Sequence, residues 1–176
     1  LNYFYTHFPK QSGFFLNFIL HVAHPCKLFL FKLNFEVYFS GKQQDKWIIN
    51  EVFKKKKNLF FVDLSATSGI IDNNTYVLEK KYNWKGIAFE PNLFFLKRLK
   101  KNRNCKISNL VISDKNHMVK FLYNGGIGGI VGKKYDNNYD KRKKLISKKK
   151  DQIQKVPAVT LENALDCSKN KVEQFI

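Results

Sequence analysis

The stretch FFVDLSATSGIIDNNTYVLEKKYNWKGIAFEPN, residues 60–92, decides the fold of this chain. It contains two short apolar runs, FFVDL at 60–64 and GIAFE at 86–90, and each closes on or next to an acidic residue. A small-residue turn and a polar, helix-like segment separate the two runs. Short apolar runs with polar flanks are typical of strands that are buried on both faces of a parallel sheet. The stretch therefore predicts a β-α-β unit with a right-handed crossover.

The neighbouring segments continue this alternation of helices and strands. QDKWIINEVF at 44–53 and LFFLKRLKKN at 93–102 have apolar residues at helical spacing, and CKISNLVIS at 105–113 has the apolar character of a strand. The order β-α-β-α-β predicts the first part of a Rossmann-like parallel sheet of the α/β class. The expected strands lie near 59–64, 86–90 and 105–112.

The turns and helix starts also have recognisable signals. Asn73 or Asn74 is expected to cap the helix that contains TYVLEKKY, and Pro91 with Asn92 is expected to start the next one. MVKFLY predicts a short added strand, and VPAVT predicts a strand after which Thr160 caps a helix.

The glycine-rich segment 125–132 does not match a phosphate-binding P-loop. Ile127 stands where that motif has a glycine, and Lys134 stands where it has Ser or Thr. We interpret the segment as a flexible surface loop. Residues 133–155 are interpreted as a solvated, charged stretch.

The composition of the 176 residues, with 44% hydrophobic and 15% aromatic residues, predicts one folded domain. The formal net charge of +18 would suit a nucleic acid or an anionic membrane surface. The charge is mostly lysine, however, and lysine rises together with Asn, Ile, Phe and Tyr, the residues of AT-rich codons. Nucleic-acid contacts favour arginine, and the chain has three arginines. We therefore favour compositional bias over a nucleic-acid partner.

The cysteines bear on the cellular compartment of the protein, and the two chain ends bear on the bounds of its domain. Three widely spaced cysteines indicate free thiols in a reducing compartment, which favours the cytoplasm, and no metal site is predicted. Residues 1–40 are apolar, but polar residues interrupt 13–39 too often for a membrane span. We expect 1–40 to be a leader without its own fold, with a signal-anchor and weak membrane association through 13–39 as the alternative. Residues 41–176 are expected to form a domain truncated at its carboxyl end.

Asp63 and Glu90 mark the expected site, because ligands of open α/β sheets lie beyond the carboxyl ends of the strands. Glu90 follows Gly69 by 21 residues, close to the offset at which a carboxylate meets the ribose hydroxyls in nucleotide-binding β-α-β units. The alternative is that Glu90 only caps the helix that starts near Pro91.

The turn SATSG at 65–69 distinguishes two nucleoside cofactors. A dinucleotide needs three glycines that let its pyrophosphate approach the backbone, and only Gly69 is present. S-adenosylmethionine has no phosphate, and its positive charge suits an acidic residue such as Asp63. The turn therefore favours S-adenosylmethionine over NAD.

These motifs, together with QDKWIINEVF, LKKNRNCKISNLVISDKN and VTLENALD, resemble those of FkbM-type methyltransferases from about Gln44 onward. That resemblance implies a class I S-adenosylmethionine-dependent enzyme that O-methylates a sugar or a small metabolite. It also implies that Asp63, Ser65 and Gly69 line the methionine side, that Glu90 holds the ribose, and that Ser113 and Asp114 lie near the adenine. It names no catalytic base.

The chain departs from the family pattern VDxGANDG in its first loop. Ser65 replaces the first glycine, Thr67 replaces Asn, and Ser68 replaces Asp. A side chain at Ser65 opposes a positive φ. Because the family continues into a D-x-E-G strand, we expect this chain to be incomplete or inactive as a catalyst. The alternative function is a lysine-rich protein that binds nucleic acid or an anionic surface on a degenerate methyltransferase scaffold.

Overall fold

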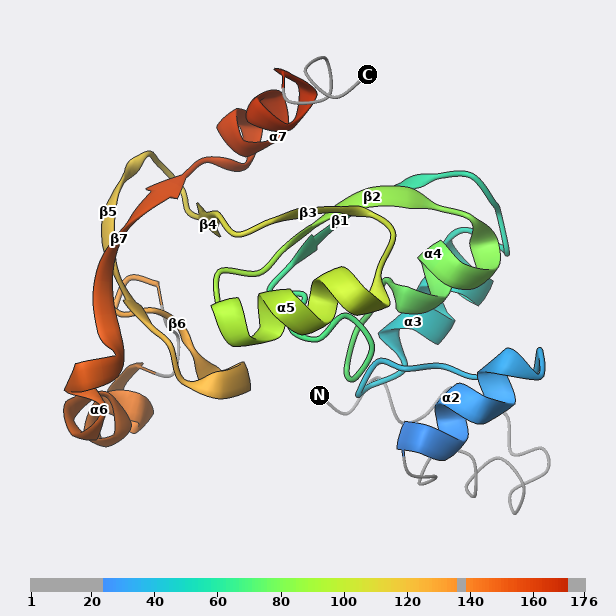
Figure 1. The fold of residues 1–176 in the computed structure, drawn as a ribbon, viewed down its shortest axis with the longest axis horizontal. Helices are drawn as coiled ribbons and strands as arrows, with labels where there is room; N and C mark the ends of the chain where they lie inside the picture. The colour runs from blue at the N-terminus through green and yellow to red at the C-terminus, as the bar shows by residue number, and fades with distance from the viewer. Residues whose placement is uncertain (1–23, 136–138, 171–176) are drawn as a thin grey trace.

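The computed structural model describes residues 24–135 and 139–170 (Figure 1). Its elements, in chain order, are α2 (His24–Lys32), α3 (Gln44–Trp47), the π-helical turn η1 (Ile48–Val52), β1 (Phe60–Leu64), α4 (Tyr76–Tyr82), β2 (Lys85–Phe89), α5 (Leu93–Asn102), β3 (Lys106–Ser108), β4 (Val111–Ile112), β5 (His117–Leu122), the 3-10 turn η2 (Gly125–Ile127), β6 (Gly129–Ile130), α6 (Tyr139–Lys148), the 3-10 turn η3 (Lys150–Gln152), β7 (Ile153–Val159) and α7 (Leu161–Asn170).

The first sheet has the order β1-β2-β3 and is parallel throughout. Phe61 pairs with Gly86 and Asp63 pairs with Ala88, so the two apolar runs of residues 60–92 are adjacent parallel strands, as predicted. The ring of Phe61 lies over Gly86, where an added Cβ would come 2.5 Å from it. Glycine at this position therefore allows the two strands to keep their close packing.

The predicted strand 105–112 is wrong as a single element, because the chain divides it between two sheets. β3 ends at Ser108 and pairs with β2, whereas β4 begins at Val111 and pairs with β7. Between them, the Ser108 Oγ accepts a hydrogen bond from the Leu110 N–H at 3.3 Å. A side chain that bonds the local backbone competes with the strand ladder, and here the chain turns away from the first sheet.

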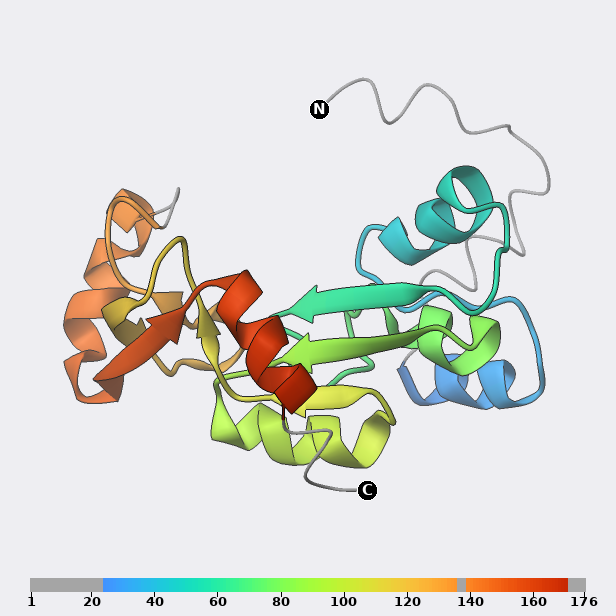
Figure 2. The same ribbon diagram turned by 90° about the horizontal axis from the view of Figure 1, so that it is seen from above.

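The second sheet has the order β4-β7-β5-β6, with β5 antiparallel to both β6 and β7. It includes the strands predicted from MVKFLY and VPAVT. The glycine-rich segment is not wholly a loop, because β6 pairs with β5 through Ile130 and Phe121. This sheet and α6 lie to one side of the β1-β2-β3 sheet (Figures 1 and 2).

Helix α7 connects the two sheets. Ala164 packs in one buried cluster with Ile87 and Phe89 of β2, and Val159 of β7 lies against the same cluster. The Thr160 Oγ accepts a hydrogen bond from the Asn163 N–H at 3.2 Å, so the predicted cap is confirmed. The chain is thus a mixed α/β protein with a three-stranded parallel sheet, which is compatible with a Rossmann-like fold.

The amino-terminal part of the described chain differs from the expected leader without a fold. Phe31 of α2 makes ring contacts with Phe39 and Tyr76, at centroid distances of 5.4 and 5.6 Å. Residues 24–40 therefore contribute to the main core, because their aromatic side chains bury apolar surface against α4. Residues 1–23, where the rest of the expected leader falls, lie outside the described residues.

The lengths and the starts of the described helices can be compared with the sequence. In residues 24–135 and 139–170, no helix is long and apolar enough to cross a membrane. Asn92 caps α5 as predicted, accepting from the Phe94 N–H at 3.0 Å. The cap position of α4 is Thr75 rather than Asn73 or Asn74, because the Asn73 side chain is held within a buried polar network.

Candidate ligand site at the carboxyl ends of β1 and β2

The loop 65–69 leaves β1 and lies against the end of β2. The Ala66 N–H donates to the Phe89 carbonyl at 3.1 Å, and the Gly69 N–H donates to the Ala66 carbonyl at 2.9 Å. Ser65, Thr67 and Gly69 have positive φ angles of 61°, 49° and 79°. Positive φ is costly for residues with a side chain, and most of all for a β-branched one. The loop therefore holds a conformation that suits glycine at positions where this chain has Ser65 and Thr67.

Glu90 anchors this loop and the start of α5. The Thr67 N–H donates to its Oε2 and the Asn92 N–H donates to its Oε1, each at 2.8 Å. Burial raises the pKa of Glu90, the two N–H donors lower it, and the charge of Asp63 raises it further. An ionised carboxylate has about four lone-pair positions, so two remain for a ligand. The anchoring role expected as an alternative is thus present.

Asp63 lies in a buried polar network rather than free at the strand end. Its Oδ2 accepts from the Thr75 hydroxyl at 2.6 Å and from the Asn73 Nδ2 at 2.8 Å. The Arg103 Nη1 lies 3.9 Å from the same oxygen. Because an arginine charge lies so close, Asp63 attracts a cationic ligand less strongly than an isolated carboxylate does.

Arg103 is the central residue of the network, and its side chain is fully buried. Its Nε donates to Glu79 at 2.8 Å, its Nη1 to the Gly69 carbonyl at 3.2 Å, and its Nη2 to the Thr75 hydroxyl at 2.9 Å. Our sequence analysis missed this role. The available signal was the rarity of arginine in a lysine-rich chain, since arginine is the cation suited to buried, multiply bonded sites.

Gly69 provides the close contact between the loop and α5. A Cβ at this position would lie 2.6 Å from the Leu99 Cδ1 and 2.7 Å from the Arg103 Cγ. Asp63, Ser65, Gly69 and Glu90 lie at one edge of the first sheet, at or just after the ends of β1 and β2.

Ser113 and Asp114 directly follow β4 of the second sheet. The Ser113 N–H donates to the Val159 carbonyl at 2.9 Å, which continues the pairing of β4 with β7. Asp114 is exposed and forms an ion pair with Lys134 at 2.7 Å. Ser113 and Asp114 follow β4, which pairs with β7 and not with the first sheet. The division of the predicted strand 105–112 therefore also separates these two residues from the other four predicted site residues.

A pocket of about 440 Å³ lies next to Glu90, beyond the carboxyl ends of β2 and β3. None of the described residues that line it is charged. Its polar groups come from Asn92, Asn109, Tyr123 and Gln154, which the sequence analysis did not select. Its apolar lining consists of Pro91, Leu93, Leu110, Val111, Val156 and Pro157. Such a pocket suits a neutral ring with apolar faces and polar edges.

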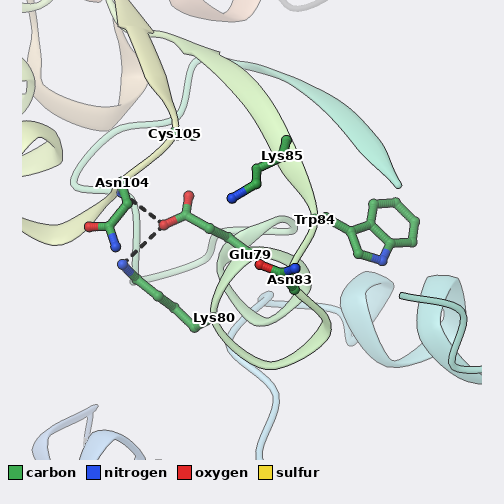
Figure 3. A pocket seen from close by; sticks show the side chains of 7 residues that line it. All are labelled: Glu79, Lys80, Asn83, Trp84, Lys85, Asn104 and Cys105. Atoms are coloured by element: carbon green, nitrogen blue, oxygen red, sulfur yellow. Dashed lines mark hydrogen bonds and ion pairs between the residues drawn. The ribbon is translucent and has the colours of Figure 1, made fainter. Parts of the chain in front are cut away.

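A smaller pocket of about 180 Å³ lies at the opposite ends of β2 and β3 (Figure 3). Burial raises the pKa of Glu79, but the Asn104 N–H and the charge of Arg103 outweigh burial and lower it to about 2. Burial raises the pKa of the Cys105 thiol to about 12. An inert thiol and a fully engaged carboxylate do not form a reactive site, so the site of interest is at the edge that holds Glu90.

The described residues contain no cluster of His, Cys, Asp and Glu that could hold a metal ion. Comparisons of the chain with protein-family models, with curated proteins and with solved structures found no match.

Proposed function

We propose that this chain binds S-adenosylmethionine and is a methyltransferase whose acceptor is a hydroxyl group of a sugar or a small metabolite. The observation that carries the proposal is the position of Glu90. Glu90 directly follows β2, its carboxylate holds the strained loop 65–69, and the lining of the neutral pocket begins at the next residue, Pro91. The residues implied by the resemblance to FkbM-type methyltransferases supply four members of this arrangement: Asp63, Ser65, Gly69 and Glu90.

Glu90, the neutral pocket and the loop 65–69 suit the ribose, the base and the methionine part of the cofactor, respectively. A ribose on Glu90 presents both hydroxyls to the two remaining lone-pair positions of the carboxylate. The base then falls into the uncharged pocket between Asn92 and Asn109, and the methionine part extends over the loop toward β1. We therefore assign the base to this pocket instead of to Ser113 and Asp114.

The backbone of the loop favours S-adenosylmethionine over a dinucleotide. The N–H groups of Ala66, Thr67 and Gly69 already donate to acceptors within the protein. A pyrophosphate needs such donors free and pointing at it. A ligand without phosphate does not need them.

The local charge also supports a cationic ligand. Residues 59–92 contain four acidic residues and three lysines, a net charge of −1 in a chain of net charge +18. Glu90 contributes one of these acidic groups and is buried, whereas the charge of Asp63 is offset by Arg103 at 3.9 Å. Buried carboxylates stabilise a nearby positive charge more than exposed ones do, because solvent screens them less. S-adenosylmethionine supplies a methyl group on a positively charged sulfur, and the residues of this chain bind and orient it.

Glu90→Gln is expected to weaken the binding of S-adenosylhomocysteine at least about tenfold, because a charged hydrogen-bond acceptor contributes about 1.5 to 3 kcal/mol. Isothermal titration calorimetry measures this change. Glu162→Gln, an exposed substitution on α7 with the same charge change, is the matched control. Equal affinity of wild type and Glu90→Gln would restrict Glu90 to anchoring the loop and contradict the proposal.

Leu93→Trp tests the base pocket separately. Leu93 lines the pocket and is 61% exposed, so a larger side chain there can fill the mouth without entering the core. We expect roughly tenfold weaker binding of adenosine and of S-adenosylhomocysteine, with an unchanged melting temperature. The control is Leu33→Trp, since Leu33 is similarly exposed just after α2. Undiminished binding of adenosine to Leu93→Trp would place the base elsewhere.

A further inference from the structure

Half of the net positive charge of the chain lies in one continuous region. Residues 115–155, which include β5, β6, η3, α6 and the start of β7, contain twelve Lys and Arg residues against three Asp residues, a net charge of +9. Residues 59–92, with the candidate site, have a net charge of −1. Residues 41–58 and 93–114 have net charges of +4 and +5, at a similar density. The positions of the lysines within 115–155, and not their number, must therefore support a binding role.

Helix α6 exposes a group of lysines. Lys143, Lys144 and Lys148 are exposed, whereas Leu145 and Ile146 are half-buried. Within the described part of the chain, none of these lysines forms an ion pair. The outward side of this part of α6 is thus a row of cations without an ion pair to any described side chain.

The adjacent sheet has a second unfavourable arrangement of like charges. Lys120 of β5 pairs directly with Lys155 of β7, and both side chains are exposed. Like charges directly opposite each other in an antiparallel pair destabilise the sheet, by roughly 0.2 to 1 kcal/mol. A bound anion that contacts both lysines removes this cost.

We infer that the region formed by α6 and the β5–β7 pair binds the phosphate backbone of a nucleic acid. This inference goes beyond the proposed methyltransferase function and does not depend on it. An anionic membrane is the less suitable partner. None of the large exposed hydrophobic residues among the described side chains comes from α6, whereas helices that lie in a membrane surface insert an apolar face. The lysine row instead provides point charges for phosphates.

The test is the binding of a short, fluorescein-labelled single-stranded RNA to the full chain, followed by anisotropy between about 50 and 200 mM salt. Wild type is expected to bind with an affinity that falls steeply as salt rises. The triple variant K143Q/K144Q/K148Q should bind about tenfold more weakly and with a smaller salt slope, because fewer counterions are released. These side chains are exposed, so the fold is expected to be retained, which circular dichroism checks.

The matched control is K97Q/K100Q/K101Q, which removes the same charge from exposed positions of α5. It should retain most of the RNA affinity. An equal loss in both triple variants would show only a general attraction to a basic protein and overturn the inference. Binding to phosphatidylserine vesicles with no binding to RNA would overturn it in favour of a membrane.

Discussion

Arg103→Met is expected to destabilise the fold by about 3 to 5 kcal/mol, the usual cost of removing one partner from a buried charge network. Met fills most of the volume but donates no hydrogen bond. Glu79 then loses its Nε donor, and the Gly69 carbonyl and Asp63 lose a cation that lies 3.2 and 3.9 Å away. Because marginal domains have only about 5 to 15 kcal/mol of stability, this loss is a large fraction of the total.

Urea unfolding followed by circular dichroism measures this loss. The control is Arg98→Met, since Arg98 is exposed and contacts only the face of Phe94 at 4.3 Å among the interactions found. That substitution should cost less than about 1 kcal/mol. A loss for Arg103→Met no larger than for Arg98→Met would show that the network does not stabilise the fold.

The pH dependence gives a second measurement for the same variant. Glu79 has a pKa of about 2 in the folded chain, below its usual value of 4.5. A lowered pKa contributes stability above pH 4.5, and this contribution is lost as the pH falls toward 2. In Arg103→Met the pKa of Glu79 is no longer held so low, so this acid-dependent loss should become smaller.

The strand pairing could be predicted from the sequence because two local signals agreed. The apolar runs at 60–64 and 86–90 have the length of buried strands, and the segment between them has the length of a crossover helix. The division of 105–112 could not be predicted in this way. The apolar pattern continues through Leu110 and Val111, and the change of sheet depends on β7, which lies more than forty residues later.

The site residues at the strand ends could be predicted from the sequence. The site residues that are positioned by tertiary contacts could not. Asp63 and Glu90 follow directly from the positions of β1 and β2. The burial of Arg103 does not, because it follows a lysine-rich helix end that is typical of an exposed surface. Ser113 and Asp114 were selected through the resemblance, and their place in the second sheet follows from the division of the strand.

Gly69→Ala is expected to destabilise the fold by about 2 to 5 kcal/mol, because two costs add. The first is conformational, since Gly69 has a φ of 79°. The second is steric, since the new Cβ would lie 2.6 Å from Leu99, which is completely buried, and 2.7 Å from Arg103. Neither neighbour can move freely. Leu99 is packed in the core, and Arg103 is fixed by its hydrogen bonds to Glu79 and Thr75.

Variants of two other glycines distinguish the conformational cost from the steric cost. Gly125 has a φ of 51° and open space around its Cβ position, so Gly125→Ala carries only the conformational cost, about 1 to 2 kcal/mol. Gly126 has open space as well and no positive φ, so Gly126→Ala should be nearly neutral. Urea unfolding of the three variants should therefore rank them with Gly69→Ala the least stable. If Gly69→Ala loses no more stability than Gly125→Ala, the loop moves away from α5 at little cost. Its contact with Leu99 and Arg103 then cannot be what holds residues 65–69 in position beside Glu90.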